Sequence, residues 1–129
     1  MYKEAILECH KNIRPFIHKT PVLTSQLINE IVGAELFFKC ENFQKMGAFK
    51  MRGAINAITK LTDKEKSKGV VTHSSGNFAQ ALSLAAKKLG VTAHIVMPSS
   101  APKVKQKAVA GYDGLITISE PTLKVREFE

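Results

Sequence analysis

The chain has 129 residues, of which 44% are hydrophobic and 23% are charged, and it carries a formal net charge of +8. This composition is typical of a globular protein and excludes a disordered chain, and no apolar run reaches the ~20 residues that cross a membrane. The 19 lysines and arginines are spread along the chain without a nucleic-acid-binding motif, so we expect no nucleic-acid partner. Cys9 and Cys40 form no disulfide framework and no apolar signal core follows Met1, so we expect a cytoplasmic protein.

Four elements are predicted in the first 61 residues from hydrophobic periodicity. Pro15 ends the first helix and Gly33 the second, and Leu27 and Ile31 are expected on the apolar side of the second. The predicted elements are a helix over residues 1–12, a helix from a cap at Thr24 or Ser25 to Gly33, a strand over 35–39 and a helix over 50–61. Residues 62–68 are polar and lysine-rich, which predicts a linker or a short exposed helix.

The second half of the chain alternates short apolar strands with amphipathic helices. Such an order with short turns indicates right-handed crossovers and a parallel sheet, hence an α/β fold. The predicted elements are strands over residues 69–72, 91–97 and 115–118, helices over 78–89 and 102–110, and a further helix that begins at Pro121. Gly90 and Gly111 are expected to end the two complete helices, and Val104, Ala108 and Val109 to face the core.

Lys50 is the first candidate for chemistry. It begins the predicted 50–61 helix and follows three small or apolar residues, Gly47, Ala48 and Phe49. Burial of a lysine favours its neutral amine, which can attack an aldehyde and hold pyridoxal phosphate as a Schiff base. Most lysines are solvated surface residues, however, so this stretch alone favours an ordinary surface lysine.

The second candidate is the polar turn 74–77, which lies between a predicted strand and a predicted helix. Ligands of α/β sheets bind at the carboxyl ends of the strands, and the N–H groups of a helix amino end suit a carboxylate or phosphate. Gly76 lets the backbone approach a ligand closely, and Ser74, Ser75 and Asn77 add short hydrogen-bonding side chains. An ordinary helix cap explains the same residues equally well.

Taken together, two stretches carry a family resemblance. They are ENFQKMGAFKMRGA at residues 41–54 and THSSGNFAQ at 72–80, supported by HKTPVL at 18–23 and IVMPSSAPK at 95–103. These motifs resemble the threonine dehydratase and serine racemase family of pyridoxal-phosphate enzymes, over nearly the whole chain. The resemblance implies the α/β fold of the tryptophan synthase β-subunit, a parallel three-layer sheet with crossover helices, in truncated form.

The resemblance also implies a role for each candidate residue. Lys50 holds the cofactor as a Schiff base and moves the α-proton on one face, and Phe49 packs against the cofactor ring. Asn77 hydrogen-bonds the ring hydroxyl, and residues 74–77 bind the substrate carboxylate. Ser75 occupies the position of the acid or base on the opposite face in the racemases. The implied reactions are elimination from serine or threonine, which yields a 2-keto acid and ammonia, and racemisation of serine.

The chain departs from the family pattern in several places. The glycine-rich phosphate loop of the family and the partner of its pyridine nitrogen come from later sequence, and the eight glycines here are scattered. Phe78 replaces a common histidine, and residues 112–114 depart from the usual glycine–alanine turn. We expect residues 1–62 to be an incomplete large-domain segment and residues 63–129 to be most of the small domain.

Such an incomplete large domain has a physical consequence. Leu36, Phe37 and Phe38 would lack partner strands and leave apolar surface exposed. The alternative to an enzyme is therefore a non-catalytic remnant or subunit that associates through its incomplete sheet, either as a homo-oligomer or with a complementing chain.

Overall fold

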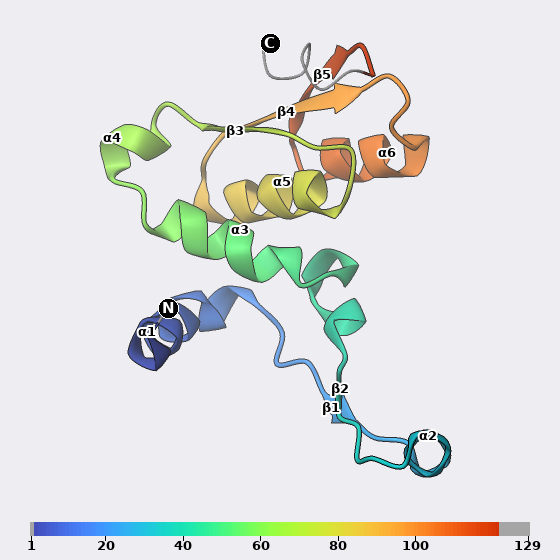
Figure 1. The fold of residues 1–129 in the computed structure, drawn as a ribbon. Coiled ribbons are helices and arrows are strands. Elements are labelled where there is room, and N and C mark those ends of the chain that lie inside the picture. Colours follow the sequence, from blue (N-terminus) through green and yellow to red (C-terminus); the bar gives the residue numbers. More distant parts are fainter. Residues whose placement is uncertain (1, 122–129) are drawn as a thin grey trace.

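The structure is a computed structural model that describes residues 2–121 (Figure 1). The predicted helix beginning at Pro121 lies outside the described residues. Among the helices of residues 2–121, none combines the length and apolar character needed to cross a bilayer.

The first half of the chain forms three helices and one pair of short strands. Its elements are α1 (Lys3–Ile13), β1 (Val22–Leu23), α2 (Gln26–Val32), β2 (Phe38–Lys39) and α3 (Lys50–Thr59), with the one-turn 3₁₀ helices η1 (Arg14–Phe16), η2 (Glu41–Phe43) and η3 (Lys45–Gly47). Ser25 caps α2 by accepting a hydrogen bond from the Ile28 backbone N–H, and Gly33 ends the helix at a φ of 67°. Both helix-end predictions are confirmed.

The predicted strand over residues 35–39 is only partly correct. It is reduced to β2, which pairs antiparallel with β1, so that Val22 lies opposite Lys39 and Leu23 opposite Phe38. Pro21 directly precedes β1 and the strand has two residues, so no alternating pattern predicted it.

The second half forms the parallel sheet. Its elements are α4 (Asp63–Lys66), β3 (Val70–His73), α5 (Asn77–Leu89), β4 (Ala93–Pro98), α6 (Lys103–Gly111) and β5 (Leu115–Ser119), with strand order β3-β4-β5 and every pair parallel. Sequential order with right-handed crossovers puts α5 and α6 on one face of the sheet, as Figure 1 shows. The sheet, α5 and α3 lie one above another.

The core fills the space between these layers. It is built from small and medium residues of α3, α5 and β4, among them Met51, Ile55, Ile58, Ala79, Ala85 and Ile95, all of them buried. Each buried isoleucine side chain contributes about 1.5–3 kcal/mol relative to an exposed one. This packing fixes α3 on α5, and both site candidates are at the start of one of these two helices.

One prediction for α6 is wrong, and one is confirmed. Val109 is buried, but Val104 is 70% exposed, because five residues at 100° each place it about 140° around the helix from Val109. Gly111 ends the helix as predicted: it is the last residue of α6, and Tyr112 is the cap. The left-handed residue of this turn is Asp113, with a φ of 62°.

Apolar side chains of α2 and β2 lie outside the core. Leu27 and Ile31 are exposed rather than packed, contrary to the expected apolar contact, and α2 lies away from the sheet in Figure 1. Phe37 and Phe38 are exposed as predicted, whereas Leu36 is half-buried. Phe38 does not lack a partner strand, because it pairs with Leu23 of β1. The proposed division between residues 62 and 63 falls between α3 and α4 and stays a prediction.

Candidate active site

The two candidate stretches begin neighbouring helices. Lys50 is the first residue of α3, and Asn77 is the first residue of α5. The two helices pack against each other, η3 also contacts α5, and the amino ends of α3 and α5 point to the same side of the pair in Figure 1. Packing of α3 on α5 thus places Lys50 and Asn77, 27 positions apart in the sequence, at the amino ends of two neighbouring helices.

Lys50 is held at the end of a sharply bent loop. Met46 and Gly47 both adopt positive φ angles, 56° and 76°, which bends the chain within η3, just before α3. The Nζ atom of Lys50 lies 5.0 Å from the ring centroid of Phe49, and both side chains are exposed. Burial of Lys50, which the apolar neighbours suggested, is therefore not supplied by the described residues.

An ion pair anchors the loop at both ends. The Arg52 guanidinium donates from Nε to Glu41 Oε2 and from Nη2 to Glu41 Oε1, each at 2.8 Å, and Thr20 Oγ1 donates to Oε1 at 2.6 Å. The bond from Arg52 lowers the pKa of Glu41 to about 2 despite its partial burial, and the same pair raises the pKa of Arg52. Arg52, two residues after Lys50, is therefore paired with Glu41.

Gln44 ties the same loop to an upstream segment. Its side chain accepts a hydrogen bond from the His18 backbone N–H at 2.8 Å and donates to the His18 carbonyl at 2.9 Å. Its oxygen also accepts from the Lys45 N–H at 2.9 Å, and the residue is only 3% exposed. These bonds explain why HKTPVL accompanies the Lys50 motif, a connection that no local spacing indicates.

Neutralising Glu41 should weaken the fold in a pH-dependent manner. The lowered pKa means that its stabilisation is complete above about pH 4.5 and is lost as the pH falls toward 2. Glu41→Gln should therefore lower the free energy of unfolding by about 1–2 kcal/mol at pH 7, a value reduced for the partial exposure of Glu41. The free energy of unfolding of this variant should also fall less steeply as the pH is lowered. Urea unfolding between pH 2 and 7 checks this, with exposed Glu35→Gln as the control. An acid limb as steep as that of the unmodified chain contradicts it.

The polar turn is organised by Ser74. Its backbone N–H donates to the Val96 carbonyl at 3.0 Å, which extends the β3–β4 ladder by one residue. Its Oγ accepts from the N–H groups of Gly76, the N-cap residue of α5, and of Ala79 in the first turn of α5, both at 3.3 Å. The hydroxyl hydrogen of Ser74 remains available as a donor. A Cβ at Gly76 would meet no atom within 4 Å, so the turn is open on that side.

Asn77 has a partner that sequence reasoning missed. The Nζ atom of Lys105, on α6, donates to Asn77 Oδ1 at 2.6 Å. Lys105 is one of three lysines on that helix, and nothing in their spacing distinguishes it from Lys103 or Lys107.

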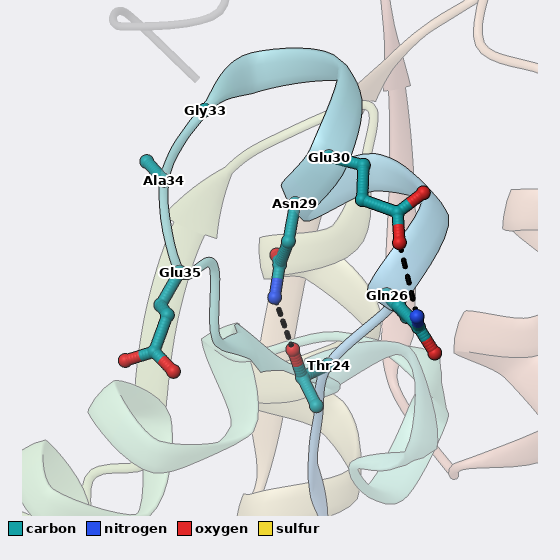
Figure 2. Close-up of a pocket in the computed structure, with 7 residues that line it drawn as sticks. All are labelled: Thr24, Gln26, Asn29, Glu30, Gly33, Ala34 and Glu35. Carbon is teal, nitrogen blue, oxygen red and sulfur yellow. Dashed lines mark hydrogen bonds between the residues drawn. The ribbon is translucent and has the colours of Figure 1, made fainter.

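Two hollows in the described chain lie elsewhere. One, of about 510 Å³, is beside α2, where Asn29 bonds Thr24 and Gln26 bonds Glu30 (Figure 2). The other, of about 590 Å³, is lined by His10, Arg14, Ile17, His18, Lys19, Lys39 and Arg52. Neither is lined by Lys50 or by residues of the 74–77 turn, so neither of these two hollows is the candidate site.

Comparison with known proteins decides the family. The model of the family described as "Pyridoxal-phosphate dependent enzyme" matches residues 13–126. The chain belongs to this family. Membership confirms the predicted family, and with it the cofactor that the family uses.

Individual relatives support the same family and the same fold. A serine racemase of Dictyostelium discoideum is 57% identical over 95% of this chain and 38% of its own length, and a β-hydroxyaspartate dehydratase of Paracoccus denitrificans is 52% identical over 96% and 39%. The solved structure of maize serine racemase superposes with a TM-score of 0.94 at 52% identity, over 97% of this chain and 38% of the other. The predicted fold is confirmed, and the chain spans less than two fifths of these relatives.

The residues present fit one end of the cofactor. Lys50 offers an accessible primary amine for the aldehyde, and Asn77 and Ser74 offer donors for an oxygen of the ring or substrate. The eight glycines form no cluster that could serve as a phosphate loop. The fit therefore covers the reactive end of pyridoxal phosphate and not its phosphate.

Proposed function

We propose that this chain is the amino-terminal part of a pyridoxal-phosphate enzyme that converts serine or threonine into a 2-keto acid and ammonia, by elimination of the β-hydroxyl group as water and hydrolysis of the resulting enamine, or that racemises serine. The observation that carries the proposal is the arrangement of two motifs, one with an accessible lysine and one rich in donors, at the amino ends of two helices packed against each other. The names of the relatives, racemases and a dehydratase, are consistent with both reactions.

Each candidate residue of the chain has a separate role in the proposed reaction. When bound, pyridoxal phosphate withdraws electrons from the substrate and stabilises a carbanion at its α-carbon. Lys50 binds the aldehyde and takes the α-proton on one side, and Ser75 exchanges a proton on the other. Donors of the 74–77 turn bind the substrate carboxylate, and the Phe49 ring packs against the cofactor.

The test is covalent capture. We expect the chain mixed with pyridoxal phosphate to develop visible absorbance, and borohydride reduction followed by peptide mapping to locate the pyridoxyl group on Lys50. Assays with serine and threonine then measure 2-keto acid, ammonia and the D-enantiomer. A folded chain without the absorbance, or one labelled on other lysines only, would contradict the proposal.

Ser75 should separate the two reactions. Ser75→Ala removes the proton donor on one face only, so racemisation of serine should fall by roughly 100-fold or more while elimination falls far less. Chiral chromatography of serine together with keto-acid release gives both rates. Ser100→Ala, an exposed serine after β4, is the control. Equal losses of both reactions would assign Ser75 to binding rather than to proton transfer.

A second candidate function is association through exposed apolar surface. Val22, Leu27, Ile31 and Phe37 are each more than half exposed on the β1–β2 pair and the elements beside it. A second copy or a complementing chain would bury them, in keeping with a division into a large-domain segment over residues 1–62 and a small domain over 63–129. A folded chain that sediments as a larger species but captures no cofactor favours this function.

The setting we propose is the cytoplasm. Cys9 and Cys40 are both free thiols in the structure, which suits a reducing compartment.

A further inference from the structure

The bond between Lys105 and Asn77 links the polar turn to the next crossover helix. Lys105 lies on α6, Asn77 begins α5, and these helices pack against each other. The bond joins residues 28 positions apart at 2.6 Å. Lys105 is half-buried, whereas Lys103 and Lys107 on the same helix are exposed. Asn77 and the bond itself lie at the exposed surface.

This bond determines which end of the Asn77 carboxamide is free. A lysine ammonium has three donors and no acceptor, so the oxygen of the carboxamide must face Lys105. The Nδ2 group, which can only donate, is then left for a ligand. The hydroxyl hydrogen of Ser74 is a donor as well, whereas the N–H groups of Gly76 and Ala79 are already bonded to Ser74 Oγ. An oxygen bound here therefore meets donors and a nearby positive charge.

We propose that Lys105 is a positioning residue that orients Asn77 as a donor and thereby selects a deprotonated, negatively charged oxygen on the bound ligand. The inference rests on the proposed function, in which that oxygen belongs to the ring hydroxyl of pyridoxal phosphate. Lys105 acts in two ways. It prevents the carboxamide from rotating to present its own oxygen, and its charge stabilises a negative charge on the far side of the amide.

The test compares Lys105→Met with Lys103→Met, which removes an exposed lysine from the same helix. Lys105→Met should weaken binding of pyridoxal phosphate by roughly five- to twentyfold, the effect of losing a bond from a charged donor. It should also move the absorbance of the Lys50 adduct from the visible toward the near ultraviolet, because the ring oxygen regains its proton. Lys105→Arg keeps a donor and should restore both. Lys103→Met should change neither.

A second readout needs no cofactor. In heteronuclear NMR spectra of the free chain, Lys105→Met should shift the side-chain amide resonances of Asn77, and Lys103→Met should leave them in place. The inference is overturned if Lys105→Met leaves the Asn77 resonances unchanged, or if it leaves the absorbance ratio unchanged. It is also overturned if Lys103→Met has equal effects, because these would indicate a general loss of charge.

The result with the unmodified chain separates the two proposals. If it forms no Lys50-dependent adduct, the proposed function fails and this inference fails with it. A normal adduct in the unmodified chain together with an unchanged Lys105→Met removes the inference alone.

Discussion

Lys50→Ala is expected to abolish covalent capture of pyridoxal phosphate, lowering the borohydride-reducible pyridoxyl label on this chain by more than about 100-fold. A primary amine is required for the linkage, and alanine offers none. The fold should survive, because Lys50 is exposed and its contact with the Phe49 ring contributes only about 0.5–1 kcal/mol at an exposed site. Mass spectrometry of the reduced protein measures the label, and circular dichroism confirms folding.

Lys60→Ala is the matched control for this experiment. Lys60 is also exposed, but it lies at the opposite end of α3 as its carboxyl-terminal cap. The Lys60→Ala variant should retain full pyridoxyl labelling of Lys50. If visible absorbance persists in Lys50→Ala, another amine of the chain forms the linkage. Lys45 is the first alternative, because desolvation and the charge of Lys88 lower its pKa.

Gly114→Ala is expected to destabilise the fold by about 2–3 kcal/mol, the cost of overpacking a buried site. Gly114 is buried between α6 and β5, where an added Cβ would collide with Ser83 Oγ and lie 2.7 Å from Val109 Cγ1. Its φ is not positive, so the reason is close approach and not backbone conformation. Thermal and urea unfolding followed by circular dichroism would show the lowered midpoint.

Two further variants identify the collision as the cause. Gly111→Ala changes a nearby helical glycine whose added Cβ meets no atom within 4 Å, and it should be neutral or stabilising by up to about 1 kcal/mol. In a Ser83→Ala background the clash with Oγ disappears, so Gly114→Ala should cost less there than in the unmodified chain. A cost that is the same in both backgrounds would contradict the packing explanation.

From the sequence, the turn before β5 was recognised only as a place where the chain differs from the family pattern. Residues 112–114 differ from the usual glycine–alanine turn, but the sequence did not indicate which residue carries the constraint. The structure assigns the left-handed position to Asp113 and the tight packing to Gly114. Two adjacent residues thus meet two different requirements, one of backbone angle and one of space.

The sequence by itself determined those features of this protein that depend on local interactions. Caps at Ser25, Gly33 and Gly90, the alternation of strands and helices over residues 70–119, and the two motifs that identify the family all depend on residues close in sequence. Periodicity and capping are set by backbone geometry over one or two turns, so they can be read without knowing the fold.

Only the tertiary structure decided how those local pieces meet. The bonds of Glu41 to Arg52, Gln44 to His18 and Lys105 to Asn77 join residues 11 to 28 positions apart, and in no pair do the two residues share a helix or a strand. The exposure of Val104, the β1–β2 pairing and the openness around Lys50 also depend on which surface packs against which. Side chains from distant segments have no shared period, and their contacts become defined only when the helices and strands pack.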